Sequence, residues 1–230
     1  MIATRHLVFL HLHKSGGTFV NQWLLRFFEG AQQIGYHLPR RLIPPELAGL
    51  PVIGLVRNPW SYYVSWYAFQ SAMSQPNALF RTLSDDGALG FEGTITNMLN
   101  LGSGGAHLEA AVAALPPSYT SRGLNLPGPQ LAAIGRTGIG FYTFLYRYMY
   151  GEDGAVHIAR MESMRDELPP LVRAAGEPIS AAAASHLAAA PPLNTTEHLP
   201  YADYYSAELR DLVAIRDGAL IERHGYRFES

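Results

Sequence analysis

The chain has 230 residues, about half of them apolar and 16% charged, which excludes overall disorder and fits one domain with a full core. Its net charge of −2 argues against broad nucleic-acid binding but allows one small anionic ligand. The absence of cysteine excludes disulfides, thiolate metal sites and a cysteine nucleophile. Because we find neither a signal-peptide pattern nor an apolar run near the roughly 20 residues of a membrane helix, we expect a cytoplasmic protein with no membrane partner.

The first elements read as a strand, a glycine turn and a helix. Residues 7–12 are apolar, as in a short buried strand, and a pair of glycines follows closely. Apolar residues recur at helical spacing across 18–28, which predicts an amphipathic helix that ends before Gly30. A weak strand is expected at 33–36.

The same order then repeats. Residues 51–56 predict a second buried strand, and Pro59 suits the first turn of a helix that we expect to reach residue 71. Two strand–helix units in succession indicate an α/β fold with a central parallel β-sheet flanked by helices.

The rest of the chain is expected to complete a single domain over 1–230. Its middle, about 84–150, is loop-rich and variable in character, and could either cover a site or form a surface insertion. After it we predict a strand, three helices and the end of the chain. These elements are a core strand at 155–160, a helix at 163–175, a short helix in 181–190 and a closing helix at 204–224.

The segment His11-Leu-His13-Lys14-Ser15-Gly16-Gly17-Thr18 joins the first strand to the first helix. A lysine, two hydroxyls and free backbone N–H groups at a helix start are typical of a phosphate site. The pattern is not that of an ATP or GTP loop, in which the lysine follows the glycines. Arg57 and Asn58 follow the second strand in a similar setting, so we infer two anion sites and a nucleotide with phosphates at both ends.

Both segments resemble those of the sulfotransferases that use 3′-phosphoadenosine 5′-phosphosulfate (PAPS), in the carbohydrate-type branch of Golgi and bacterial enzymes. There the first segment reads close to His-x-Pro-Lys-Thr-Gly-Gly-Thr, so His13 stands where proline is usual. The second reads roughly Val-Arg-Asp/Asn-Pro, followed by Ser and Tyr, matched here by Ser65 and Tyr67. The family pattern often has a second basic residue near the position of Tyr63, and this chain lacks it. Weaker matches are Arg160-Met161-Glu162, Leu193-Asn194, Tyr204-Tyr205 and Gly225-Tyr226.

The resemblance implies a three-layer P-loop-like fold, PAPS as co-substrate and no required metal. Lys14 would neutralise the departing phosphate oxygen, while Arg57 and Ser65 would hold the 3′-phosphate. The 5′-phosphate would be bound by residues of the loop. These residues are His13, Lys14, Ser15, Gly16, Gly17 and Thr18.

The acceptor must lose a proton to a base, for which the resemblance implies histidine or glutamate. His37 is our first choice, because it looks like the catalytic histidine of the uronyl 2-O-sulfotransferase branch, just after the second strand. The alternatives that the sequence leaves open are His11, His13, Asp85, Asp86, Glu92 and His107.

We therefore expect sulfuryl transfer to a hydroxyl or amine of a carbohydrate or small molecule. A kinase-like phosphotransferase is an alternative, although its lysine would be misplaced and no Mg²⁺-binding aspartate follows a strand. A non-catalytic nucleotide-binding protein on the same fold is the other, because a fold alone does not give a function. The acceptor's identity and the oligomeric state are not encoded in these patterns.

Overall fold

The computed structural model describes residues 1–191, 193 and 198–229. The chain forms two compact units, one of Met1–Arg57 with Tyr146–Thr195, the other of Asn58–Leu145 with Thr196–Ser230. The division falls between Arg57 and Asn58, inside the second of the two predicted anion-binding segments. Whether 1–230 folds as a single domain stays a prediction.

The first unit contains a five-stranded sheet, counted over the described residues, in the order β3-β1-β2-β4-β5. Strands β2, β4 and β5 are parallel, whereas β1 pairs antiparallel with both β2 and β3. The strands are β1 (Ile2–Ala3), β2 (Val8–Leu10), β3 (Gln32–Gln33), β4 (Val52–Val56) and β5 (Val156–Arg160).

The expected parallel centre of the sheet is therefore confirmed, and its antiparallel edge is a feature that the sequence did not predict. The chain enters as β1, which the sequence did not predict, and reverses over four residues into β2. Thr4 holds this reversal, because its N–H donates to the carbonyl of Leu7 at 2.9 Å and its Oγ1 accepts from the N–H groups of His6 and Leu7 at 3.2 Å. The weak strand expected at 33–36 is the exposed two-residue β3.

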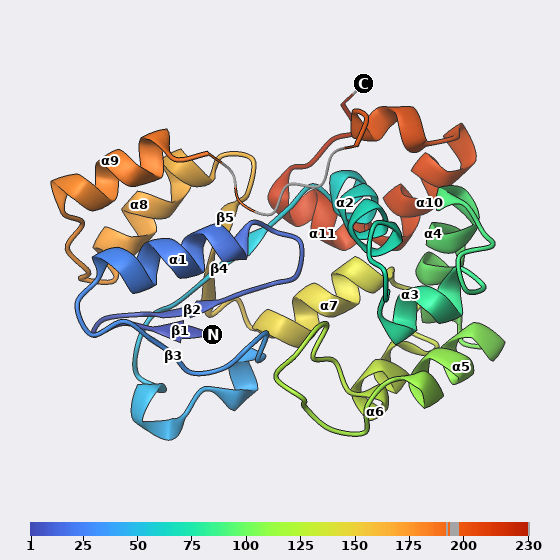
Figure 1. Ribbon diagram of the computed structural model, residues 1–230, viewed down its shortest axis with the longest axis horizontal. Helices are drawn as coiled ribbons and strands as arrows, with labels where there is room; N and C mark the ends of the chain where they lie inside the picture. The colour runs from blue at the N-terminus through green and yellow to red at the C-terminus, as the bar shows by residue number, and fades with distance from the viewer. Residues whose placement is uncertain (192, 194–197, 230) are drawn as a thin grey trace. The chain divides into compact units, whose positions relative to one another are not determined.

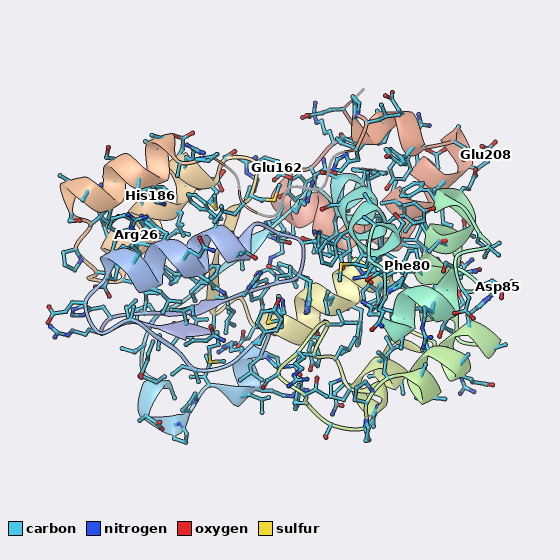
Figure 2. The ribbon with its side chains drawn as sticks, viewed as in Figure 1. Arg26, Phe80, Asp85, Glu162, His186 and Glu208 are labelled. Atoms are coloured by element: carbon cyan, nitrogen blue, oxygen red, sulfur yellow. The ribbon has the colours of Figure 1, made fainter. Side chains whose placement is uncertain are left out.

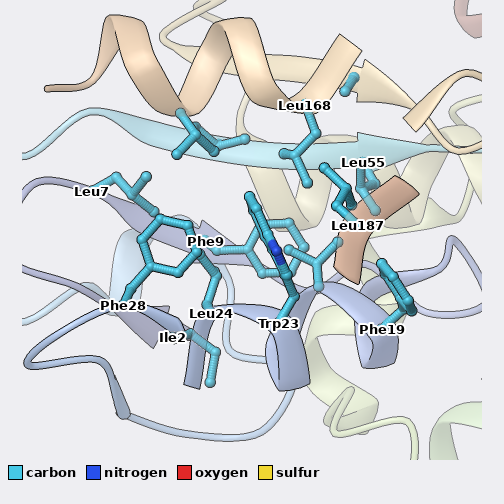
Figure 3. Packing of buried hydrophobic residues seen from close by; sticks show 14 of the residues in the cluster. Ile2, Leu7, Phe9, Phe19, Trp23, Leu24, Phe28, Leu55, Leu168 and Leu187 are labelled. Atoms are coloured by element: carbon cyan, nitrogen blue, oxygen red, sulfur yellow. The ribbon is translucent and has the colours of Figure 1, made fainter. Parts of the chain in front are cut away.

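Three helices pack on one face of this sheet (Figure 1): α1 (Gly17–Phe27), α8 (Met164–Ala174) and α9 (Ala181–Ala189). Figure 3 shows Trp23 and Leu24 of α1 between strand residues such as Phe9 and the helix residues Leu168 and Leu187. The indole of Trp23 donates to the carbonyl of Ala183 at 2.9 Å, so a buried polar group is satisfied where α1 meets α9.

The other face of the sheet meets the last turn of α7 (Phe141–Tyr150) at Gly54. A Cβ on Gly54 would lie 2.4 Å from the ring of Tyr150, so only glycine fits in the middle of β4. The Tyr150 hydroxyl donates to the Leu55 carbonyl at 2.7 Å and accepts from its N–H at 3.0 Å. The Tyr150 hydroxyl thus provides hydrogen-bond partners for the backbone of Leu55. Gly54, the residue before it, is the last residue of β4 that pairs with β2.

The second unit is helical in its described part. Figure 1 labels its longer helices α2, α3, α4, α5, α6, α10 and α11. They are α2 (Pro59–Ser71), α3 (Ala78–Leu83), α4 (Phe91–Leu99), α5 (Ala106–Ala114), α6 (Gly128–Leu131), α10 (Ala207–Arg216) and α11 (Gly218–His224). Short 3₁₀ turns occur in both units at Arg40–Leu42, Pro45–Leu47, Asn100–Ser103, Ala132–Ile134 and Tyr201–Tyr204. The middle of the chain is thus more helical than its turn residues indicated.

The closing helix predicted at 204–224 is two helices, α10 and α11, because the chain breaks at Asp217. This carboxylate is fully buried and accepts from the N–H of Thr143 at 2.9 Å and its hydroxyl at 2.6 Å. Tyr63 of α2 donates its hydroxyl to the second carboxylate oxygen at 2.7 Å and accepts from the N–H of Tyr142 at 3.1 Å. Burial raises the pKa of Asp217, and these hydrogen bonds oppose that rise.

Replacing Tyr63 by phenylalanine should lower the free energy of unfolding by about 1–3 kcal/mol, because a buried carboxylate oxygen and the N–H of Tyr142 lose their partner. Urea denaturation followed by circular dichroism measures this loss. Tyr67→Phe, at a half-buried tyrosine of the same helix, is the matched control and should cost no more than about 0.5 kcal/mol. Equal losses in both variants would contradict the prediction.

Candidate anion-binding and acid–base site

The parallel strands place three segments at one edge of the sheet. Leu10 pairs with Gly54, Gly54 with Ile158, and Val56 with Arg160. The carboxyl ends of β2, β4 and β5 therefore lie side by side, and the residues that follow them are neighbours. In open sheets of parallel strands, ligands bind at this edge.

The loop after β2 turns sharply into α1. Lys14 and Gly16 have positive φ values of 55° and 80°, and the helix begins at Gly17. A Cβ on Gly17 would lie 2.0 Å from Cδ2 of His11, and one on Gly16 would lie 2.9 Å from Cγ of Met161, the residue after β5. Close approach of the His11 ring therefore requires glycine at position 17, whereas the left-handed turn favours it at position 16.

The N-terminus of α1 has features that favour an anion. Within the described structure it has no side-chain cap, and no acidic residue occupies its first turn, where Thr18 lies half-buried. The N-terminus of α2 differs, because the side chain of Asn58 accepts from the N–H groups of Trp60 at 3.1 Å and Ser61 at 3.4 Å. An anion near the second segment would therefore depend on side chains more than on the helix end.

Lys14 and Arg57 are brought together at the strand ends. Nη1 of Arg57 donates to the backbone carbonyl of Lys14 at 3.1 Å. Burial, with the neighbouring charge of Arg57, lowers the pKa of Lys14 from 10.5 to about 8. Two cations held this close are stabilised by a multiply charged anion between them.

The predicted hydroxyl contacts occupy different places. Ser15 is fully buried, and its hydroxyl donates to the carbonyl of His13 at 3.2 Å, so it supports the loop from inside. Ser65 is a buried residue of α2 and belongs to the second unit, whereas the other predicted donor-binding residues belong to the first. Asn194, part of the resemblance, lies outside the described residues.

Three histidines and a tyrosine form a cluster beneath the loop, which we call the histidine cluster: His11, His13, Tyr36 and His37. His37 lies at its centre, with ring centroids 3.6 Å from His13, 4.2 Å from His11 and 4.1 Å from Tyr36. The His13 and His37 rings are nearly parallel, at 20°. The structure thus brings the preferred base, His37, against two of its competitors.

The tautomer of His37 follows from its hydrogen bond. Its Nδ1 lies 2.7 Å from the carbonyl oxygen of His11, which can only accept, so Nδ1 carries the proton and Nε2 keeps its lone pair. Burial lowers the pKa of His37 from 6.5 to about 4, while the bond to His11 opposes this and the positive charge of the Met1 amine adds to it. At neutral pH His37 is therefore a neutral imidazole with a basic nitrogen.

The remaining candidates for the base are three carboxylates and one histidine, and all four belong to the second unit. Asp85 lies exposed in the turn after α3 (Figure 2). Asp86 is exposed in the same turn, and His107 is exposed on α5. Glu92 is also exposed and accepts from the hydroxyl of Ser206 at 2.6 Å. All four side chains are exposed, whereas His37 is buried.

Sequence reasoning missed the supports of this site. Asn21, one helical turn after Gly17, lies with its Nδ2 at 3.1 Å from Nδ1 of His11. Met161 covers Gly16, and its N–H donates to the carbonyl of Val56 at 2.7 Å. Asn21 could have been found from its spacing on the inner face of α1. Met161 could not, because its contact with Gly16 depends on the order of the strands in the sheet.

Comparison with known proteins does not identify the chain: no protein-family model matches it, and neither does any curated protein. Within the described residues, no three His, Asp or Glu side chains are grouped so as to hold a metal ion. In that same part of the chain, none of the helices combines the length and the apolar character that crossing a membrane requires.

The lowered pKa of His37 makes stability depend on pH. The folded state binds fewer protons than the unfolded state between about 4 and 6.5, so stability should fall as the pH drops through this window. Asparagine tolerates the φ of 47° at this position. We therefore expect His37→Asn to remove about 2 kcal/mol of the unfolding free energy that the wild type loses between pH 7 and pH 5. Urea unfolding at both pH values measures it.

His157→Asn is the matched control, because His157 is exposed on β5 and should leave the pH dependence unchanged. The same loss between pH 7 and 5 in His37→Asn and in the wild type would show that His37 does not titrate as its burial requires.

Proposed function

We propose that the protein is a sulfotransferase that moves the sulfuryl group of PAPS to a hydroxyl or amine. The observation that carries this proposal is the pairing of Lys14 with Arg57 at the ends of two adjacent parallel strands, directly before the N-terminus of α1. A basic pair and a helix start bind a phosphate strongly, and the neighbouring histidine cluster supplies a base.

The donor would be held by the loop from His13 to Thr18. Gly17 and Thr18 offer the helix N-terminus to the 5′-phosphate, and Lys14 faces the bridging oxygen, where negative charge builds as the bond to sulfur breaks. Arg57 would offer its guanidinium to the 3′-phosphate, and Ser65, in the second unit, stays a predicted contact of the same group. This arrangement requires no metal.

In the transfer step, Nε2 of His37 takes the proton of the acceptor while the acceptor atom forms its bond to sulfur. The bond from sulfur to the 5′-phosphate oxygen breaks, and its electron pair stays with adenosine 3′,5′-diphosphate. Lys14 neutralises the charge that appears there. The products are the sulfated acceptor, the bisphosphate and a protonated His37.

A three-layer P-loop-like arrangement is part of the proposal. It is supported by helices on one face of the mixed sheet and by the last turn of α7 on the other. A kinase-like phosphotransferase is disfavoured because Lys14 precedes Gly16 and Gly17, so it lies in the turn itself rather than on the first turn of the helix. A nucleotide-binding protein without catalysis would have no need for a base such as His37.

The acceptor is proposed to be a carbohydrate or another small molecule, met in the cytoplasm and without a nucleic-acid or membrane partner. The low charge and the neutral base fit an uncharged hydroxyl, which is deprotonated only as it attacks. Screening sugars and phenols with labelled PAPS would identify the acceptor class.

Adenosine 3′,5′-diphosphate at about 100 times its Kd should raise the melting temperature by roughly 5–10 °C, because it binds only the folded state. ATP with Mg²⁺ should give a much smaller shift. Lys14→Met and Arg57→Met should each lose most of the shift caused by the bisphosphate, and differential scanning fluorimetry measures it.

Arg173→Met, at an exposed arginine of α8, is the control and should respond like the wild type. The proposed donor would be wrong if ATP with Mg²⁺ stabilised the protein more than the bisphosphate does. Retention of the full shift by Lys14→Met would remove the loop from the donor site.

Binding of the bisphosphate should also be accompanied by proton uptake at pH 8.5. Lys14, with a pKa of about 8, is partly neutral there, and a phosphate beside it raises that pKa. Calorimetric titrations in buffers of different ionisation enthalpy give the number of protons. Uptake should vanish in Lys14→Met, and uptake that persists in this variant would assign the proton to another group.

A further inference from the structure

His13 connects the donor loop to the base. Its ring is buried, with 8% exposed, and it lies face to face with His37. The next residue is Lys14, whose backbone is held at a φ of 55°. One stacked pair of rings therefore joins the segment that carries the lysine to the distant segment that carries the base.

We propose that His13 is a positioning residue that fixes the ring of His37 relative to the backbone of Lys14, rather than a contact to the phosphosulfate. The proposal rests on the proposed function, in which the lysine acts on the leaving group and His37 on the acceptor. Because those groups act on opposite sides of one sulfur atom, a fixed relation between them sets the line of transfer.

The contacts of His37 explain why a ring is needed at this position. His11 lies against it tilted by 51° and Tyr36 meets it at 74°, whereas His13 is the one ring in the described part of the chain that stacks nearly parallel to it, at 20°. The bond from Nδ1–H to the His11 carbonyl fixes one direction in the ring plane. The stack with His13 then fixes the tilt, so that Nε2 points in one direction.

The stack also bears on the charge that His37 acquires. An aromatic face stabilises an adjacent cation, so His13 favours the imidazolium formed when Nε2 takes the acceptor proton. By excluding water, the same ring contributes to the burial that holds the pKa of His37 low before the reaction. The titratable groups that contact His37 are His11, His13 and Tyr36, and the Met1 amine adds its charge from farther away.

The test compares His13→Ala, His13→Leu and His13→Phe in the full-length chain, with His157→Ala as control. Nuclear magnetic resonance of ¹⁵N-labelled imidazoles gives the pKa and tautomer of His37 without any ligand. In His13→Ala, which admits water to the His37 ring, we expect the pKa of His37 to rise from about 4 by one unit or more, whereas His13→Leu keeps the ring covered and should keep the low pKa. His13→Phe, which keeps an aromatic face, and the control should retain the low pKa and the Nδ1–H tautomer.

Hydrolysis of PAPS, with water as acceptor, gives the second measurement. We expect kcat to fall on the order of tenfold in His13→Ala and His13→Leu, with KM for PAPS within about twofold and an altered pH profile. His13→Phe should restore most of kcat. A rise in KM without a fall in kcat would instead assign His13 to donor binding and overturn the proposal.

The two measurements separate this proposal from the function on which it rests. If the wild type neither binds adenosine 3′,5′-diphosphate nor hydrolyses PAPS, the proposed function is wrong, whatever His13 does to His37. If the wild type is active but His13→Leu keeps the kcat of the wild type, the positioning role is wrong. His13→Leu preserves side-chain volume and decides the question if His13→Ala does not fold.

Discussion

The contact between the His11 ring and the backbone of Gly17 is the constraint on which the candidate site depends. With no side chain at Gly17, the start of α1 lies directly over the end of β2. That approach forces the chain between them into a tight loop, which gives Lys14 and Gly16 their positive φ values. It also buries His11, whose carbonyl then orients His37. One glycine thus links the proposed donor loop to the proposed base.

The electrostatics of the site follow from the same crowding. A hydrogen bond to the backbone carbonyl of Lys14 keeps the guanidinium of Arg57 beside this residue. Burial first, and the neighbouring charge of Arg57 second, lower the pKa of Lys14. A site that stores unfavourable charge before its ligand arrives binds an anion more tightly than a neutral loop, because the ligand removes that repulsion.

Most of the first unit follows from local patterns. The apolar runs of β2 and β4 and the helical periodicity of α1 are visible in the sequence, because burial on one or both faces selects their residues. β1 was not visible, since two residues carry no periodicity and its place depends on the turn at Thr4. The break at Asp217 was missed for a related reason: a buried carboxylate is explained only by distant partners such as Tyr63 and Thr143.

For the site, the sequence predicted the residues of the loop but not their division of labour. Ser15 and His13 looked like ligand contacts because they stand in the loop, yet the structure directs Ser15 to a carbonyl and His13 to the face of His37. The two helix starts also looked alike, although Asn58 caps α2 with its own side chain. The start of α1 therefore offers backbone N–H groups to an anion, in a geometry set by the turn at Gly16, whereas at the start of α2 the side chain of Asn58 already accepts from such groups.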